Sequence, residues 1–338
     1  MSDHSDILAQ SVDRLFADIA ASRPSPDEAW RSIEELGIPA LFLPETEGGM
    51  EGSWSDAEIV FQLSGYHAIE LPVGETMIAR KLLSEAGIKA PTGPLTLGRG
   101  QGDIDAASFS GTIRSLSSSL AGCQMVACVT QSTTGACVLI DPSLASHGEE
   151  RLNLAGEPRT AFTFENARCD VIVSESGLGD TIMHAGALLR AAQIGGALAR
   201  SLEQCVNYAQ ERSQFGRELR KFQAIQHQIA LLAEEAAAVA CASSSAAAAR
   251  DSGDAEFEIA CAKLRANQAT GKSALIAHQV HGAIGITEEH DLHRFTQRLW
   301  AWRSEFGNDR YWAKMLGNFM LSFNGRSPWD TIVSRGES

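Results

Sequence analysis

Two short segments of this 338-residue chain hold the residue types best suited to bind a ligand. The first, Arg212-Ser-Gln-Phe-Gly216, places an arginine, an amide and an aromatic ring where a helical run that opens near Leu188 breaks at a glycine. Arginine keeps its charge and pairs with phosphate oxygens through a planar fork. The segment therefore indicates a ligand that carries phosphate and a flat ring. A structural alternative for Arg212 is pairing with the negative end of its own helix.

The second segment, Gln279-Val-His-Gly-Ala-Ile-Gly285, is spaced by glycines. Glycine lets the backbone approach a phosphate closely, because no Cβ atom intervenes. A further helical run that carries Gln223 lies between the two segments. Each segment alone is a weak indicator of a ligand site, but the two segments in this order are a stronger one.

The elements that must position these segments are mainly helical. From residue 7 to about 87, apolar residues recur at helical spacing. Asp27 is the predicted N-cap of a helix over 28–36, and a later helix is predicted over 74–85. The glycine and proline content of 91–105 predicts a linker.

A β-rich zone follows, from about 107 to 175, and it predicts a small antiparallel β domain. Its apolar runs are separated by Ser, Gly and Pro clusters and occupy 125–130, 136–140, 160–164 and 171–173. From about 181 to the end the pattern is helical again, and about four helices in an antiparallel bundle account for it. The predicted fold is mainly α with a small β domain, divided into 1–90, 91–178 and 179–338.

Composition and charge argue against several classes of protein. The formal net charge of −14 argues against a nucleic-acid binder, and no apolar run approaches the length of a membrane span. The seven cysteines are scattered without CxxC spacing, so the sequence predicts no disulfide framework and no metal site. Two acids and two histidines lie close together at Glu288-Glu289-His290 and His293, but no further distant ligand stands out. The sequence therefore predicts no metal site there. A reducing cytoplasm is the expected location.

Together the two segments resemble the C-terminal domain of the acyl-CoA dehydrogenase family, flavoenzymes that oxidise acyl-CoA thioesters to enoyl-CoA. The stretch from Leu36 to Glu45 with Gly48-Gly49 resembles the family's N-terminal helical domain. Two stretches, 109–112 and 162–168, resemble edges of its middle β domain. The resemblance implies an N-terminal helical domain, a reduced middle β domain and a C-terminal four-helix bundle.

The resemblance also implies a cofactor, FAD, whose phosphate and adenosine end the two segments bind across a subunit interface. Carried over residue by residue, the implied FAD-binding residues are Arg212, Gln214, Phe215, Gln223, Gln279, Gly282, Ala283 and Gly285. Ala283 stands where the family has a glycine. The half that cradles the flavin ring departs from the family: Leu95–Gly100 lacks the Thr-Glu-bearing loop, and Gly111–Ser117 has no tryptophan. This chain is therefore expected to complete a partner's flavin site rather than its own.

The positions where the family carries its catalytic base also differ in this chain. Removing the α-proton of the thioester requires one well-placed carboxylate, which the family supplies from either of two positions. At the first, directly before Arg190, this chain has Leu189; at the second, Glu305 is displaced from the family pattern by an inserted-looking Phe306. Glu305 is the candidate catalytic residue, although a structural role is favoured for an acidic side chain there.

Short chains with one degraded half-site resemble the smaller subunit of the heteromeric α2β2 acyl-CoA dehydrogenases of bacterial steroid side-chain breakdown, and the stretch 292–307 fits that subgroup. The implied partners are a larger acyl-CoA dehydrogenase subunit that supplies the catalytic glutamate, an acyl-CoA substrate such as a steroid side-chain thioester, and an electron-transfer flavoprotein or similar acceptor. Two alternatives stay open: a self-sufficient homotetramer with Glu305 as base, and a non-enzymatic assembly subunit.

Overall fold

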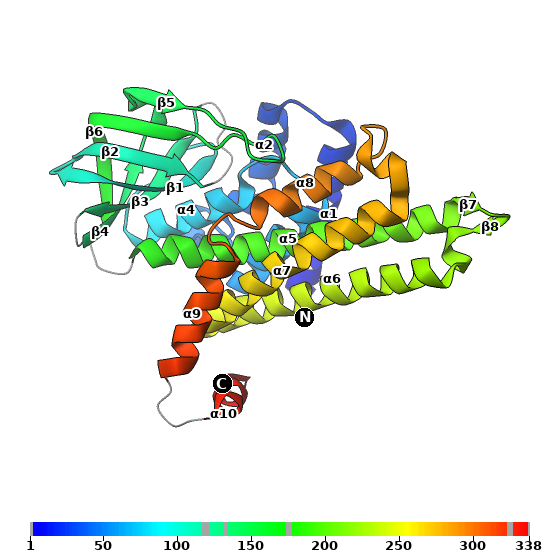
Figure 1. The fold of residues 1–338 in the computed structure, drawn as a ribbon. Coiled ribbons are helices and arrows are strands. Elements are labelled where there is room, and N and C mark those ends of the chain that lie inside the picture. Colours follow the sequence, from blue (N-terminus) through cyan, green and yellow to red (C-terminus); the bar gives the residue numbers. More distant parts are fainter. Residues whose placement is uncertain (1–2, 117–121, 132–133, 174–177, 323–326, 337–338) are drawn as a thin grey trace.

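The computed structural model describes residues 3–116, 122–131, 134–173, 178–322 and 327–336. Along the chain, a group of helices is followed by a strand region and then by long helices (Figure 1). The mainly α fold with a small β region is thereby confirmed. The division of the chain at residues 90 and 178 stays a prediction.

The first group of helices packs beside the strand region. It comprises α1 (Asp3–Ser22), α2 (Pro26–Glu35), α3 (Trp54–Tyr66) and α4 (Val73–Glu85). The predicted cap of the second helix was wrong. Its N-cap is Ser25, whose side chain accepts from the Glu28 N–H while the Glu28 carboxylate accepts from the Ser25 N–H. This reciprocal capping box, with Pro26 in the first turn, places Asp27 inside the helix.

The strands close into a small barrel. They are β1 (Leu95–Asp105), β2 (Ser108–Ser115), β3 (Gln124–Gln131), β4 (Thr134–Ile140), β5 (His147–Glu149) and β6 (Ala161–Val173). Their order is β2-β1-β3-β4-β6-β5, and an additional β2–β6 pairing joins the two sides. Phe109, Ile113 and Phe164 fill the interior, whereas Leu95 and Leu97 on the opposite face join the core shared with the helices.

Three sequence expectations for this region are corrected. The stretch 95–105 is a strand instead of a linker, and its glycines serve close packing: a Cβ atom on Gly100 would lie 2.2 Å from the Thr112 carbonyl oxygen. β1 and β3 pair in parallel, so the sheet is not wholly antiparallel. The runs expected at 160–164 and 171–173 belong to one strand, β6.

The C-terminal half is a helical bundle. Its helices are α5 (Leu178–Glu211), α6 (Gln223–Ser252), α7 (Glu256–His281), α8 (Leu292–Trp302), α9 (Asp309–Ser322) and α10 (Pro328–Gly336). α5, α6 and α7 lie side by side, and α8 packs against α5 and α7 (Figure 1). A hairpin of β7 (Ser213–Gln214) and β8 (Arg217–Glu218) joins α5 to α6 and projects at the end of the bundle (Figure 1). Short 3-10 turns occupy Ile38–Ala40, Glu45–Glu47, Pro142–Leu144, Leu219–Lys221 and Gly282–Ile286.

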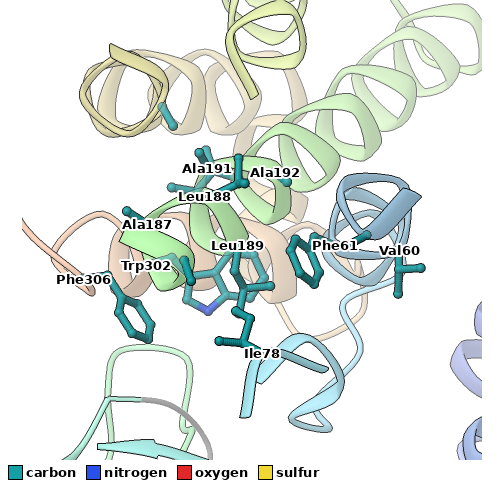
Figure 2. Packing of buried hydrophobic residues seen from close by; sticks show 14 of the residues in the cluster. Val60, Phe61, Ile78, Ala187, Leu188, Leu189, Ala191, Ala192, Trp302 and Phe306 are labelled. Carbon is teal, nitrogen blue, oxygen red and sulfur yellow. The ribbon is translucent and has the colours of Figure 1, made fainter. Parts of the chain in front are cut away.

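The N-terminal half of α5 runs through the centre of the core. Figure 2 shows Leu189 on this helix among Phe61 and Ile78 of the N-terminal helices and Trp302 of α8. Leu189 is fully buried, and a Cβ atom on Gly74 would lie 2.4 Å from its Cδ1 atom. The position directly before Arg190 is thus packed with hydrocarbon on several sides.

One helix among the described residues, α6, is long and apolar enough by composition to cross a membrane. This corrects the expectation that no apolar run approaches that length. The helix packs against α5 and α7, and 33% of the apolar window is buried in the chain. Core helices of helical bundles meet the same test, so this composition is weak evidence for a span.

Candidate functional site

The first ligand-type segment forms the tip of the β7–β8 hairpin. Phe215 and Gly216 form its two-residue turn, with φ of 52° and 77°. Positive φ at both positions is the geometry of a type I′ turn, which normally favours asparagine or glycine at the first of them. Phe215 nevertheless occupies it and leaves its side chain 91% exposed. Phe215 thus holds a bulky side chain in a left-handed conformation, and its ring makes an edge contact with Phe222 at a centroid distance of 6.2 Å.

The polar residues in and beside the hairpin also have exposed side chains. Arg212 directly follows α5, and its N–H donates to the Tyr208 carbonyl at 2.9 Å. The side chains of Arg212 and Gln214 are exposed and make no hydrogen bond or ion pair with any described residue. Gln223, also exposed, is the first residue of α6, where unpaired backbone N–H groups favour an anion. These groups are available to a ligand from another molecule.

The second segment lies where α7 ends. Gln279 is exposed in the last turn, and Gly282 follows with a φ of 65° and open space around its Cα atom. Ala283 is exposed in the 3-10 turn after it. Gly285, by contrast, is buried, and a Cβ atom there would lie 2.8 Å from the His281 Cβ atom. Packing alone explains the glycine at 285, and its contact with FAD stays a prediction.

Tyr208 and His281 bring the two segments to one end of the bundle. Their rings stack with centroids 4.8 Å apart, and His290 packs edge-on against His281 at 4.6 Å. Tyr208 lies one turn before Arg212, and His281 directly precedes Gly282. Burial lowers the pKa of His281, so the ring at this contact is neutral near pH 7. The His281 ring is therefore a packing contact that joins α5 to the end of α7.

Glu305 lies away from this end, in the loop after α8, and its carboxylate is engaged on both oxygens. Oε1 accepts from Arg159 Nε at 2.9 Å, from Arg159 Nη2 at 2.6 Å and from Asn153 Nδ2 at 3.1 Å. Oε2 accepts from Arg190 Nε at 2.8 Å. The Glu305 side chain is only 12% exposed. A carboxylate held by two guanidinium groups is stabilised as the anion and positioned by them.

The network extends to two more glutamates. Arg190 Nη2 lies 2.9 Å from Glu75, and Arg159 Nη2 lies 2.9 Å from Glu157. Burial raises the pKa of Glu157, but Arg159, Arg298 and Arg190 outweigh it and hold that pKa below its ordinary value. Burial likewise lowers the pKa of Arg190, and Glu305, Glu75 and Glu157 raise it above normal overall. Glu157 is therefore held as the anion and Arg190 as the cation at pH 7.

Two buried side chains fix the loop around Glu305. Phe306 has a φ of 49° and is 2% exposed. It packs on Gly186 of α5, where a Cβ atom would lie 2.1 Å from the ring. The Arg190 guanidinium lies 5.6 Å from the ring centroids of both Phe306 and Trp302. The residue that interrupts the family pattern thus forms part of the core.

Sequence reasoning missed most of this network. Glu75, Glu157, Arg159 and Arg190 come from widely separated parts of the chain, and no local spacing connects them. An arginine within the hydrophobic stretch of α5 was the one available signal, because a buried guanidinium requires carboxylate partners. Among the described residues, no group of three or more His, Cys, Asp or Glu is placed to hold a metal ion.

The strands that stand where the family's ring-contacting segments fall are β1 and β2. Their described residues 95–100 and 111–115 include no aromatic side chain, while Ser117 lies outside the described residues. A flavin ring needs a flat apolar wall and hydrogen bonds to its edge. Residues 95–100 and 111–115 offer no aromatic side chain for such a wall.

Comparison with known proteins identifies the family. The profile described as "Acyl-CoA dehydrogenase, C-terminal domain" matches residues 180–319. The acyl-CoA dehydrogenase IpdE2 of Mycobacterium tuberculosis is 30% identical over 83% of this chain and 83% of its own length. The chain belongs to the acyl-CoA dehydrogenase family. IpdE2 of Mycolicibacterium smegmatis is 28% identical over 80% of each chain.

Solved acyl-CoA dehydrogenase structures share the fold over nearly the whole chain. The Tcur3481-Tcur3483 steroid ACAD matches with a TM-score of 0.85 and 20% identity, covering 96% of this chain and 99% of its own. The ChsE4-ChsE5 complex from Mycobacterium tuberculosis matches with a TM-score of 0.81 and 17% identity, covering 96% and 98%. At these identities the likeness shows the fold, and it confirms the arrangement expected of an acyl-CoA dehydrogenase.

Proposed function

We propose that this chain is the smaller subunit of a heteromeric, FAD-dependent acyl-CoA dehydrogenase. It contributes the adenosine and pyrophosphate half of a FAD site, while a larger partner subunit holds the flavin ring and supplies the catalytic glutamate. The proposed reaction is α,β-dehydrogenation of an acyl-CoA thioester.

The observation that carries this proposal is the exposed hairpin. The β7–β8 hairpin projects at the end of the bundle (Figure 1). The exposed side chains of Arg212, Gln214 and Phe215 form no hydrogen bond or ion pair with the described residues. A set of a guanidinium, an amide and an aromatic face, presented outward from a rigid two-residue turn, suits a ligand held by a second molecule. The hairpin and the turn at Gly282 face the same end of the bundle, so both can contact one extended ligand.

The residues present fit one end of FAD. Arg212 would pair with a phosphate, Phe215 would cover a ring face, and the backbone around Gly282 would lie against the pyrophosphate. FAD supplies the hydride acceptor when it is bound. Residues 95–100 of β1 and 111–115 of β2 carry no aromatic side chain for the flavin ring, which supports assigning that half to the partner.

The network around Glu305 supports a base on the partner. A general base must accept a proton from the substrate, and both oxygens of Glu305 already accept from Arg159 and Arg190. Freeing this carboxylate would leave two buried guanidinium groups without part of their charge compensation. Leu189, at the family's other base position, has no proton-accepting group.

The relatives suggest the substrate class. One solved structure with the same fold is a steroid ACAD, and another is the two-protein ChsE4-ChsE5 complex. By analogy, the proposed acyl group is a steroid side chain carried as its CoA thioester. An electron-transfer flavoprotein or similar carrier is the proposed electron acceptor, and the cytoplasm is the proposed location.

The test is flavin content, measured by visible absorbance, of the chain alone and after co-expression with a candidate larger subunit. The chain alone should be colourless and the complex yellow. Arg212→Gln should weaken FAD retention in the complex about 10- to 150-fold, the equivalent of a lost charged hydrogen bond of about 1.5–3 kcal/mol. Arg310→Gln, an exposed arginine on α9 far from the hairpin, is the matched control.

Two results would replace the proposal with one of its alternatives. Stoichiometric flavin on the chain alone, with turnover abolished by Glu305→Gln, would establish a self-sufficient homotetramer. Unchanged flavin content in the Arg212→Gln complex would instead favour an assembly subunit without flavin contact.

A further inference from the structure

A cavity of about 940 Å³ lies between the N-terminal helices and the bundle. Residues of α1, α3, α5 and α8 line it, and most of the lining surface is apolar. None of the described residues of the hairpin or of the loop around Glu305 belongs to the lining. The cavity is therefore separate from both regions described above.

The cavity is wide because α1 contributes small side chains to it. Four of its lining residues are alanines of that one helix, Ala9, Ala17, Ala20 and Ala21. Longer apolar side chains at these positions would fill the space. Larger apolar surface comes from Leu63 of α3 and Phe295 of α8. An apolar wall with this much room suits the body of a small molecule.

A smaller cavity of about 340 Å³ adjoins the first near the C-terminal end of α1. Ala20, His67 and Arg294 line both cavities. The Arg294 side chain, which is 21% exposed, therefore lies where the two meet. An elongated ligand can extend from one cavity toward the other beside this guanidinium.

Arg294 has no close carboxylate partner among the described residues. Its ion-pair contacts with Glu70 and Asp291 are both at 3.9 Å, beyond hydrogen-bond distance. Glu70 lies closer to Arg298, at 2.9 Å, and Asp291 lies closer to Arg23, at 3.2 Å. Burial, together with the positive charges of Arg298 and Arg23, lowers the pKa of Arg294. A half-buried guanidinium in this setting is stabilised by an added anion.

The other charged side chains that line the larger cavity are already paired. Asp13 Oδ1 lies 2.7 Å from His67 Nε2, and Asp291 pairs with Arg23. Arg200 Nη1 donates to Glu203 at 2.6 Å. A ligand with one negative charge therefore matches Arg294, whereas a second negative charge would be repelled by the nearby carboxylates of the lining.

We propose that the two cavities form a binding site for an aliphatic carboxylic acid. The Arg294 guanidinium binds the carboxylate through its planar fork of N–H groups. The aliphatic chain lies in the larger cavity, against the alanines of α1 and against Leu63 and Phe295. The site uses no residue of the proposed FAD half-site, so it does not depend on the proposed function.

The test is isothermal titration calorimetry of the full-length chain with octanoate. Binding should be saturable at one site and at least tenfold weaker for acetate, which lacks the chain, and for 1-octanol, which lacks the charge. Octyl phosphate should also bind more weakly, because it carries a second charge. Arg294→Gln should raise the Kd for octanoate at least tenfold. Arg212→Gln at the hairpin and Arg310→Gln on α9 are the matched controls and should leave the Kd unchanged.

Ala20→Leu tests the site without altering its charges. Leucine is a good helix former, so α1 should be retained, while the longer side chain should obstruct the place where the two cavities meet and weaken octanoate at least tenfold. Thermal melting monitored by circular dichroism verifies that each variant is folded. Absence of saturable octanoate binding would overturn the proposal, as would an unchanged Kd in folded Arg294→Gln or Ala20→Leu. Tighter binding of octyl phosphate than of octanoate would overturn the assignment to a carboxylic acid.

Discussion

The end of the bundle and the junction around Glu305 use the same residue types in opposite ways. At the hairpin, Arg212 is exposed and its charge has no partner among the described residues. At the junction, Arg190 is 2% exposed and its guanidinium contacts Glu75 and Glu305. Charged side chains that are already compensated inside a protein serve its structure, because exchanging their partners for a ligand costs desolvation and lost bonds. Uncompensated ones on a projecting turn can bind a ligand without that loss.

The largest expected effect comes from breaking the buried network. Arg190→Met should lower the free energy of unfolding by about 3–5 kcal/mol, because it leaves Glu75 and Glu305 buried without their shared guanidinium. Urea denaturation monitored by circular dichroism would measure it. Arg310→Met on the exposed face of α9 is the control. A loss below about 0.5 kcal/mol, the range of ordinary surface substitutions, would contradict the structural role assigned to the junction.

A smaller loss is expected at Lys263, which fastens the loop that carries Glu305. Its Nζ atom donates to the Trp302 carbonyl at 3.1 Å and to the Arg303 and Gly307 carbonyls at 3.3 Å. Lys263→Met should lower the free energy of unfolding by about 1–3 kcal/mol, since buried acceptors lose their donor. Urea denaturation would again measure the change, and a stability equal to the unsubstituted chain would exclude this anchoring role.

Lys263 also predicts a pH dependence. Burial lowers its pKa to about 7, below the ordinary value of 10.5, so between these values the unfolded chain binds the proton more readily than the folded one. The free energy of unfolding therefore gains a contribution that rises with pH from about 7 to 10.5. Unfolding series at several pH values should show a shallower slope in Lys263→Met. Parallel slopes would mean that the lysine keeps its ordinary pKa in the fold.

The smallest effect on stability is expected at the hairpin, where function should suffer instead. Phe215→Ser removes a ring that is 91% exposed and should change the free energy of unfolding by less than about 0.5 kcal/mol. In the co-expressed complex the same variant should retain less FAD. If the Phe215→Ser complex retained as much flavin as the unsubstituted complex, Phe215 would not belong to the proposed half-site. A large loss of stability would contradict the distinction between the hairpin and the junction around Glu305.

Much of the architecture could be predicted because it rests on local patterns. Helical spacing indicated α4, short apolar runs between Ser, Gly and Pro clusters indicated β3 and β4, and Gly216 marked the break between α5 and α6. Local rules failed where two signals competed. Ser25 and Asp27 are both good caps, and Glu28 selected the first by completing the capping box. The glycines of 95–105 indicated a linker, although they allow β1 to lie closely against its neighbours.

The sequence by itself determined that an arginine, an amide and an aromatic ring stand together at Arg212–Gly216, and that leucine stands where a base could be at 189, because residue identity decides both. The tertiary structure decided what Glu305 does, since Arg159 and Arg190 reach it across 146 and 115 residues of chain. It also decided that β1 pairs in parallel with β3, which depends on how the strands are ordered in the sheet. Contacts between distant residues follow from packing and desolvation of the whole fold, and no local pattern of residues encodes them.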